Sequence, residues 1–294
     1  MTRPRLAVTL GDPRGIGPEI VARALDDERV RAAADWVTLG PTGAGAAPAI
    51  SVGPWVAGGR AADAGRLAGL AIERAVAMAV AGDVAGIVTA PIDKSAFAAA
   101  GYAEPGHTEL LARLTGKRTA MMLASDRLRV VLATTHLALR DVPGAVTTDA
   151  IVGAATIARA GLREWFGIAE PRIALCALNP HAGDGGRFGD EDSRVLAPAA
   201  RAVGIAGPFP ADTVFVRAMR GEFDVVIAPY HDVGMTAIKV ASFGHAVNVT
   251  LGLPFPRTSP DHGTALDIAG TGVADASSMI HAMLVAAEIS ARVQ

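Results

Sequence analysis

Short apolar runs alternate with stretches of helical periodicity along most of this chain. Residues with helical spacing lie between the runs, and the longest of these stretches are 61–82 and 147–166. The apolar runs are bounded by Gly, Pro or polar turn residues and cover residues 5–10, 84–91, 128–135, 172–178 and 224–230. Strands that alternate with helices predict an α/β protein with a partly parallel sheet.

The first apolar run leads into a glycine-rich turn and then into a helix. Gly15-Ile16-Gly17 begins the dinucleotide-binding fingerprint, but Ile20 stands at the last position, where that fingerprint needs Gly or Ala. Pro18 suits a first helical turn. The pattern therefore predicts strand, turn and helix, and it argues against a fingerprint-type cofactor site at this turn.

Three of the buried runs stop at or shortly before a histidine, namely His136, His181 or His231. A single histidine at a strand end is usually a hydrogen-bonded packing residue. Three at successive strand ends would meet at one rim of a parallel sheet, where imidazoles can hold zinc, nickel, cobalt or manganese. Asp232 would then be a fourth ligand or a partner that orients a ring. The alternative is that the three rings serve only in proton transfer or hydrogen bonding.

Residues 224–268 concentrate the polar chemistry of the chain among short apolar runs and sharp turns. Lys239 lies in the apolar segment AIKVASF, so we expect it to be buried, with an anionic partner or a lowered pKa. It could then bind a substrate carboxylate or phosphate, or transfer a proton. Arg257 lies in a stiff Pro-flanked segment that suits bidentate anion recognition, and Asn248 lies on a strand between the two cations. The segment therefore predicts a small, multiply anionic substrate.

His107 and Thr108 stand at a predicted helix start. A helix start leaves free backbone N–H groups, so these two residues could hold an anion there. Equally, Thr108 could be a plain N-cap. Both interpretations stay open on the sequence alone.

Composition narrows the classes of partner and compartment. Lys plus Arg number 27 and Asp plus Glu number 29, a balance that argues against binding to nucleic acid or to an anionic membrane. Cys176 is the single cysteine, so no internal disulfide forms and a reducing compartment fits. No segment is typical of a signal peptide or a membrane helix. We therefore expect a soluble, cytoplasmic protein.

Eight sequence blocks together resemble one known family. They span nearly the whole chain in order and are GDPRGIGPEI, TAPIDK, GHTE, LRVVLATTH, LNPHAGDGG, GPFPADT, YHDVG and VNVTLGLPFPRTSPDHGTALDIAG. These blocks are similar to the 4-hydroxythreonine-4-phosphate dehydrogenase (PdxA) family of the vitamin B6 pathway. More distantly, GIGPEI and HGTALDIAGTGVA resemble the isocitrate and isopropylmalate dehydrogenase superfamily.

The resemblance implies a two-lobed fold with a mixed, partly parallel sheet and an active site in the cleft between the lobes. Residues 1–118 together with 238–294 would form the first, cofactor-binding lobe. Residues 119–237 would form the second lobe, which binds the metal and makes the homodimer.

The resemblance also implies a role for each candidate residue. The metal ligands would be His136, His181 and His231, shared across the homodimer interface. Lys239 would be the catalytic residue that transfers a proton, or a substrate ligand. The substrate would be bound by His107, Thr108, Lys239, Asn248 and Arg257. The adenosine part of NAD or NADP would be bound by His262, Thr264 and Asp267.

The implied reaction is oxidation of a secondary alcohol β to a carboxylate, followed by loss of CO2. It uses NAD or NADP and one divalent metal, which would be Zn, Co, Ni, Mn or Mg. The metal would acidify the hydroxyl and polarise the ketone that forms from it. The expected substrate is 4-phosphohydroxy-L-threonine and the product 3-amino-2-oxopropyl phosphate.

Two departures from the family pattern bear on the substrate. Val233 follows His-Asp where the family usually has Gln, and Asp93 stands in TAPIDK where Asn is common. They put recognition of the amino group in doubt, so 4-phospho-D-threonate and 4-phospho-D-erythronate are alternative substrates. A second alternative is a non-redox acyl or phosphate transferase, or an anion-binding protein, of similar fold.

Overall fold

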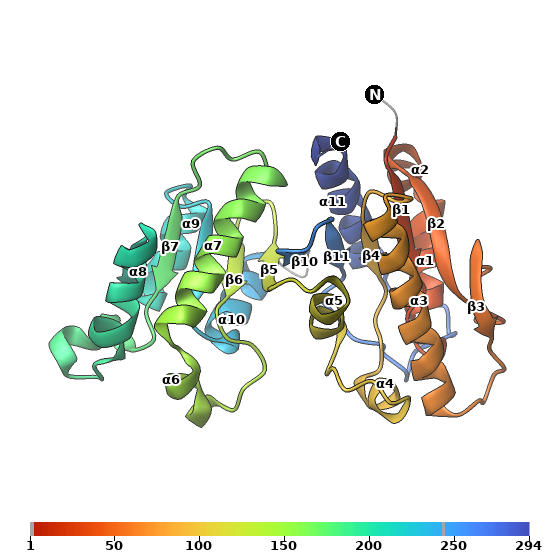
Figure 1. The fold of residues 1–294 in the computed structure, drawn as a ribbon, viewed down its shortest axis with the longest axis horizontal. Coiled ribbons are helices and arrows are strands. Elements are labelled where there is room, and N and C mark those ends of the chain that lie inside the picture. Colours follow the sequence, from red (N-terminus) through yellow and green to blue (C-terminus); the bar gives the residue numbers. More distant parts are fainter. Residues whose placement is uncertain (1–2, 243–244, 294) are drawn as a thin grey trace. The chain divides into compact units, whose positions relative to one another are not determined.

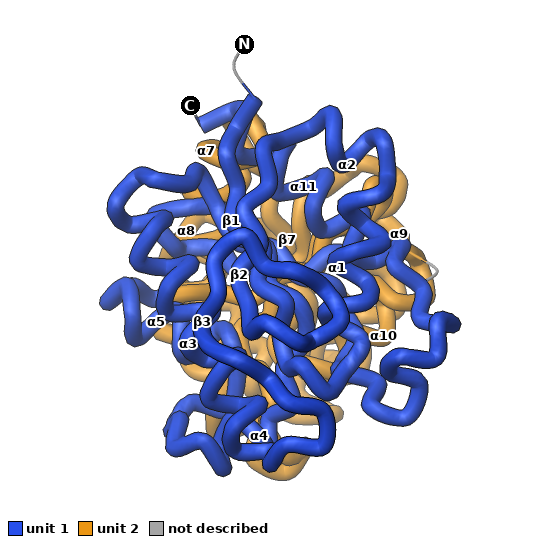
Figure 2. The backbone as a smooth tube through the Cα atoms, turned by 90° about the vertical axis from the view of Figure 1, so that its right-hand side faces the viewer, with its two compact units in different colours: residues 1–118, 247–294 blue, residues 119–246 orange. Residues whose placement is uncertain are grey.

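The chain folds into two compact units, which Figure 2 colours separately. The computed structural model describes residues 3–242 and 245–293. Unit 1 comprises Met1–Arg118 and Val247–Gln294, and unit 2 comprises Thr119–Ala246. The family resemblance implied that the chain re-enters the first lobe at residue 238. That residue lies inside the helix α10 (His231–Ser242), and the boundary between the two units comes after this helix.

Unit 1 is built on a mostly parallel sheet with strand order β3-β2-β1-β4-β11-β10. Only β10 runs antiparallel to its neighbour, β11. Its strands are β1 (Arg5–Thr9), β2 (Asp35–Thr42), β3 (Ile50–Pro54), β4 (Ile87–Thr89), β10 (Val247–Leu251) and β11 (Arg257–Ser259). Its helices are α1 (Gly17–Asp26), α2 (Glu28–Ala33), α3 (Ala61–Ala81), α4 (Lys94–Ala99), α5 (His107–Thr115) and α11 (Ser277–Val293).

Helices cover both faces of the unit 1 sheet, with α3 in front of the strands and α1 and α11 behind them in Figure 1. The inner strands are therefore buried on both sides, and β1 exposes only its first residue. A strand buried on both faces reads as a continuous apolar run, which is why residues 5–10 and 84–91 predicted strands. The predicted helix 61–82 is confirmed by α3, which ends at Gly82 in a left-handed conformation.

In unit 2 the sheet strands follow the order β5-β6-β9-β7-β8, and only the β5–β6 pair among them is antiparallel. Its strands are β5 (Ala120–Ala124), β6 (Arg129–Leu132), β7 (Ile173–Cys176), β8 (Ala206–Phe209) and β9 (Val225–Ala228). Its α-helices are α6 (Val142–Ala145), α7 (Thr148–Glu164), α8 (Ala197–Val203), α9 (Ala211–Met219) and α10. Its other helical turns are η1 (Leu139–Asp141), η2 (Pro180–Gly186) and the π-helical η3 (Asp192–Leu196).

The apolar core of unit 2 lies between this sheet and the helices α9 and α10. Side chains from β6, β7 and β9 pack there against Phe215 of α9 and Ile238 of α10. Helix α7 covers the other face of the sheet (Figure 1). The three strands that precede the predicted metal histidines are neighbours in the order β6-β9-β7, and all are parallel.

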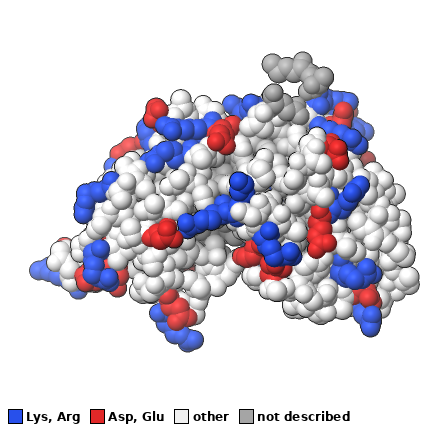
Figure 3. Space-filling view, viewed as in Figure 1, with Lys and Arg blue, Asp and Glu red and all other residues white. Residues whose placement is uncertain are grey.

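The surface carries both signs of charge. On the face drawn in Figure 3, basic and acidic side chains are interspersed rather than gathered into a stripe of one sign. Among the described residues, no helix is both long and apolar enough to cross a membrane.

Helices α3 and α4 touch through two glycines of α3. A Cβ atom added to Gly65 would lie 2.1 Å from the carbonyl oxygen of Ala96, and one added to Gly69 would lie 2.1 Å from the ring of Tyr102. Tyr102 in turn stacks on Phe97 of α4, with ring centroids 4.1 Å apart. The missing side chains allow the two helices to approach.

We predict that Gly65→Ala lowers the free energy of unfolding by about 1–3 kcal/mol, because the new methyl group must push α4 away from α3. Urea denaturation followed by circular dichroism measures this change. Gly144→Ala is the matched control, since an added Cβ meets nothing within 4 Å there. Equal stability of the two variants would show that the contact between α3 and α4 is looser than described.

Candidate functional site

A pair of histidines lies at the ends of two neighbouring strands of unit 2. His136 follows β6 and His231 follows β9, and their ring centroids are 5.4 Å apart. Two contacts hold the strand ends together: the Ala133 N–H donates to the carbonyl oxygen of Ala228 at 2.9 Å, and the Thr134 hydroxyl donates to that of Pro229 at 2.8 Å. The parallel pairing of β6 and β9 therefore sets the spacing of the two rings.

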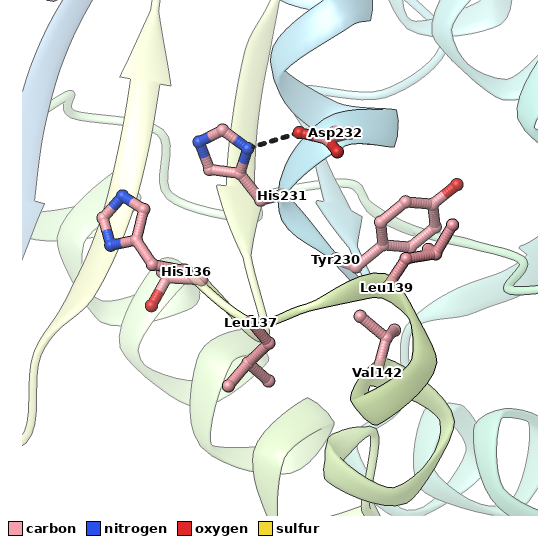
Figure 4. Close-up of a pocket in the computed structure, with 8 residues that line it drawn as sticks. His136, Leu137, Leu139, Val142, Tyr230, His231 and Asp232 are labelled. Atoms are coloured by element: carbon pink, nitrogen blue, oxygen red, sulfur yellow. Dashed lines mark hydrogen bonds and ion pairs between the residues drawn. The ribbon is translucent and has the colours of Figure 1, made fainter.

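Asp232 fixes the orientation of the His231 ring. Its carboxylate lies 2.7 Å from Nδ1 of His231, and Figure 4 shows the other ring nitrogen turned toward the side of His136. In the neutral ring, a proton on Nδ1 that is shared with the carboxylate leaves the Nε2 lone pair available to a metal. The two rings lie in a pocket lined by Thr135, His136, Leu137, Leu139, Val142, Tyr230, His231 and Asp232.

His181 lies apart from this pair. Its exposed ring is 6.3 Å from that of Phe188, centroid to centroid. Among the described residues, no three His, Cys, Asp or Glu side chains come together in a way that could hold a metal ion. Within the described part of one chain, His181 therefore does not complete a three-ligand group with the His136–His231 pair.

The backbone around His181 is unusual. Residues 181–186 all have positive φ angles, including the non-glycine residues His181 at 54°, Ala182 at 55° and Asp184 at 42°. Left-handed conformation costs a non-glycine residue about 1–2 kcal/mol. Strain of this kind persists only where the surrounding structure imposes it, and it concentrates at functional sites.

Unit 1 contains a buried arginine that lacks a full set of partners. Arg257 on β11 is 2% exposed and donates to the hydroxyls of Thr250 at 2.9 Å and Thr89 at 2.5 Å. Among the described residues its Nε has no hydrogen-bond partner. Burial lowers the pKa of Arg257 to about 9, which Glu109 partly offsets, so the guanidinium is still charged at neutral pH. A buried cation held only by hydroxyls is suited to receive an anion.

Other unsatisfied polar atoms of the same unit belong to two candidate substrate residues, His107 and Asn248. Nε2 of His107 and Oδ1 of Asn248 are both shielded from solvent and lack a hydrogen-bond partner in the described structure. Burial, followed by the positive charges of Arg257 and Lys94, holds the pKa of His107 well below its usual 6.5. His107 is therefore neutral at physiological pH.

Residues 261–270 form a loop that is docked on the opening turn of unit 1. The Thr264 carbonyl accepts from the N–H of Ile16 at 2.9 Å, and a Cβ added to Gly15 would lie 2.8 Å from that same oxygen. This close approach is what the Gly-rich turn provides. The loop leaves Nε2 of His262 shielded and without a partner in the described structure, and it leaves Asp267 exposed.

The chain matches a known protein family. Residues 19–286 match the family model described as pyridoxal phosphate biosynthetic protein PdxA. The chain belongs to the PdxA family. The resemblance inferred from the motifs is therefore confirmed, and with it the expectation of a dehydrogenase, whose reaction needs a nicotinamide cofactor.

Similar PdxA-family proteins include two differently named enzymes. The chain is 43% identical to a 4-hydroxythreonine-4-phosphate dehydrogenase of Desulfosudis oleivorans, over 96% of this chain and 94% of the other. It is 40% identical to a D-threonate 4-phosphate dehydrogenase of Salmonella typhimurium, over 97% and 98%. The expected substrate and one alternative therefore both occur in the names of relatives.

Solved structures confirm the expected fold class. A 4-hydroxythreonine-4-phosphate dehydrogenase structure from Klebsiella pneumoniae has a TM-score of 0.87 at 39% identity, with 98% of each chain covered. An isocitrate dehydrogenase from Methylococcus capsulatus has a TM-score of 0.50 at 15% identity, covering 95% of this chain and 83% of the other, and so shares the fold. The distant resemblance noted in the PdxA motifs is thus a likeness of fold.

Lys239 departs from its expected environment. Residues 237–242 of the apolar run AIKVASF belong to α10, in which Ile238 points into the core and Lys239 is exposed. A helix turns about 100° per residue, so the neighbour of a buried residue need not be buried. The expectation of a buried lysine was wrong, and its proposed role must be that of an exposed side chain.

The structure also brings forward residues that the motif analysis left without a role. Thr89 and Thr250 hold the guanidinium of Arg257, and Lys94 adds a positive charge near His107. Thr89 is the last residue of the buried strand β4, and Lys94 begins the helix that follows it. Ligands commonly bind at such strand ends, so that signal could have found both residues. Thr250 offered no such signal, because threonine is ordinary in strands.

We predict that unit 1 loses stability as the pH falls from 7.5 to 5, in part because of His107. The unfolded chain takes up a proton on this ring near pH 6.5, whereas the folded protein does not, so acid favours unfolding by at most about 1.4 kcal/mol per pH unit. His107→Gln should flatten this dependence. Urea unfolding at several pH values in phosphate-free buffer measures it, and identical pH profiles for both proteins would contradict the buried neutral ring.

Proposed function

We propose that this PdxA-family protein is a metal-dependent, NAD(P)-dependent dehydrogenase that oxidises and decarboxylates a phosphorylated hydroxy acid. Its substrate is 4-phosphohydroxy-L-threonine and its product 3-amino-2-oxopropyl phosphate. The observation that carries the proposal is the buried guanidinium of Arg257, which has no hydrogen-bond partner at Nε among the described residues. The names of the relatives supply the reaction class.

The phosphate is the anion that this region of unit 1 binds. Arg257 can offer Nε–H, and Thr108 lies in the first turn of α5, whose free N–H groups favour an anion. Nε2 of the neutral His107 ring can accept a hydrogen bond from a protonated phosphate oxygen or a substrate hydroxyl. Asn248 contributes an amide oxygen that accepts a hydrogen bond from a substrate hydroxyl or amino group. Desolvated, directional contacts of this kind favour a phosphorylated substrate over its dephosphorylated form.

The metal ligands are His136, His181 and His231. Two observations support this assignment: the rings of His136 and His231 lie close together, and the carboxylate of Asp232 orients the His231 ring. Since His181 lies apart from that pair, we propose that two copies of the chain complete one site, as a homodimer. When bound, the divalent ion (Zn, Co, Ni, Mn or Mg) acidifies the substrate hydroxyl and stabilises negative charge on the oxygen during decarboxylation.

The nicotinamide cofactor binds against the loop 261–270. His262 has a shielded ring nitrogen that can hydrogen-bond to it, Thr264 sits beside the opening turn, and the exposed carboxylate of Asp267 suits ribose hydroxyls. A carboxylate in that role favours NAD over NADP, because it repels a 2′-phosphate.

The remaining steps fall to side chains of the chain itself. Oxidation of the alcohol sends a hydride to the nicotinamide and releases the hydroxyl proton, and loss of CO2 then leaves a carbanion equivalent that must be protonated. Lys239, which is exposed on α10, is our candidate for these proton transfers and for binding the substrate carboxylate. The phosphate contacts hold the reacting carbon in place throughout.

The two departures from the family pattern involve internal contacts. Asp93 caps α4 through the N–H of Ala96 at 2.7 Å and pairs with Arg14 at 3.3 Å, while Val233 packs against the core of unit 2. Neither residue replaces the lost family side chain with an equivalent one. We therefore retain 4-phospho-D-threonate and 4-phospho-D-erythronate as the alternative substrates for the same chemistry.

We also propose that the protein is cytoplasmic. Burial raises the pKa of Cys176 to about 12, so this thiol is protonated and shielded, which suits a reducing compartment but does not require one.

A non-redox transferase or anion-binding protein is the second alternative function. The paired histidines argue against it, because such a protein needs no metal site.

A substrate screen tests the proposal directly. The protein is incubated with NAD or NADP, a divalent metal, and each of the three phosphorylated acids, and absorbance of the reduced cofactor is followed. We expect one of the acids to give clear turnover that thorough chelation abolishes and added metal restores. No turnover with any of them would refute the proposed dehydrogenase substrates, and full activity without metal would refute the metal mechanism.

A second test concerns the phosphate contact. We expect Arg257→Ala to lower kcat/KM for the phosphorylated substrate by about 100-fold or more and to affect a dephosphorylated analogue far less, because a charged hydrogen bond is lost only with the former. Inorganic phosphate should raise the Tm of the wild type but not of the variant. Arg257→Lys is the control that retains charge without the forked geometry. Equal losses for both substrates would remove Arg257 from phosphate binding.

A further inference from the structure

Asp192 holds the chain at the point where it leaves β7 for His181. This carboxylate is 1% exposed, and its two oxygens accept the backbone N–H groups of Leu178 at 2.8 Å and Asn179 at 3.0 Å. Those are the last residues before Pro180 and the left-handed segment 181–186. Asp192 thus anchors the start of that segment from a position fourteen residues beyond Leu178.

A second contact holds the same end of the loop through the side chain of Asn179. The side-chain amide of Asn179 donates to Glu191 at 2.8 Å, and Gly189 lies directly over this bond. A Cβ added to Gly189 would lie 2.6 Å from the Glu191 carboxylate and 2.8 Å from the Asn179 amide. The start of the segment is therefore fastened to Glu191 and Asp192 by three hydrogen bonds, and Gly189 at its end packs closely against the Glu191–Asn179 contact.

The fastened segment is also the strained one. His181 and Ala182 would each relax toward negative φ if the ends of the loop were released, because left-handed conformation is unfavourable for both. Relaxation would redirect the His181 ring. Residues that oppose it therefore control where that ring points, although neither Glu191 nor Asp192 need touch the metal or the substrate.

We propose that Asp192, with Glu191, is a positioning residue that holds His181 in the orientation required for metal binding. The inference rests on the proposed function, because it takes His181 as a metal ligand. It adds that the imidazole is presented by a strained turn whose geometry is imposed by two buried or half-buried carboxylates on the following helical turn.

The test compares variants of the full-length protein for Zn²⁺ affinity by calorimetry and for the absorption spectrum of bound Co²⁺. Asp192→Asn replaces one acceptor oxygen by an amide donor, which opposes a backbone N–H, so Zn²⁺ affinity should fall about 10- to 100-fold. Asp192→Glu, which keeps two acceptors, should recover part of the affinity. Asp190→Asn is the matched control, since Asp190 is exposed and its carboxylate pairs with Arg194 on the surface.

A second readout needs no metal. In the metal-free protein, amide hydrogen exchange at Leu178 and Asn179 should be faster in Asp192→Asn than in the wild type, while the rest of unit 2 keeps its protection. If Asp192→Asn does not fold, Glu191→Ala carries the same test with a smaller expected loss of affinity, because it removes only the contact to the Asn179 side chain.

The outcomes separate this inference from the proposed function. His181→Ala serves as the reference that should lose the metal. Metal lost in His181→Ala but bound with wild-type affinity by a folded Asp192→Asn would overturn the positioning role and leave the proposed function standing. Full metal retention in His181→Ala would overturn the ligand assignment and the positioning role together. Weakened binding in Asp192→Asn with faster exchange at the two amides, and an unchanged Asp190→Asn, supports the proposal.

Discussion

The organisation of unit 1 depends on keeping one positive charge out of water without giving it a carboxylate to bond with. Removing a guanidinium from solvent is costly, and the hydroxyls of Thr89 and Thr250 return only part of that cost. These two residues come from different strands, and the guanidinium comes from a third, so β4, β10 and β11 must be in register before the site exists. An incoming phosphate therefore meets the positive charge of Arg257. The ring of His107 is neutral and adds no second positive charge beside it.

The chemistry of the chain is divided between its two units. Unit 1 carries the buried arginine, the unsatisfied histidine and asparagine atoms, and the docked loop 261–270. Unit 2 carries the imidazole pair, which depends on the parallel pairing of β6 with β9, and the separate His181 turn. The two sets of candidate residues differ in what positions them. In unit 1 polar groups are buried without partners, and in unit 2 the ends of parallel strands place the histidine rings.

The sequence was most informative where local pattern and tertiary environment coincide. Strands buried on both faces, such as β1 and β9, produce uninterrupted apolar runs, so their ends and the histidines that follow them could be predicted. The run around Lys239 is equally apolar, but an apolar run of this length fits a helix as well as a strand, and here it is a helix. The local sequence pattern therefore did not predict the side to which Lys239 points.

Two features of the site lay beyond sequence reasoning for a physical reason. Thr89 and Arg257 are 168 positions apart, so their hydrogen bond follows from sheet topology rather than from any local pattern. The left-handed segment at His181 was also hidden, since His, Ala and Asp ordinarily avoid that conformation and only the glycines suggest it. The contacts of Asp192 that impose the turn come from a residue that reads as an ordinary helix-start carboxylate.

The discontinuity of unit 1 has a consequence for how the protein is made. Unit 2 is one uninterrupted stretch of chain, Thr119–Ala246, whereas the unit 1 sheet needs β10 and β11 from the last fifty or so residues. During synthesis from the N-terminus, the first 118 residues emerge with the β4 edge of their sheet unpaired, and β11 reaches that edge only after all of unit 2 has emerged. A chain that terminates after unit 2 therefore contains the His136–His231 pair, but it leaves the β4 edge unpaired and lacks the anion site around Arg257.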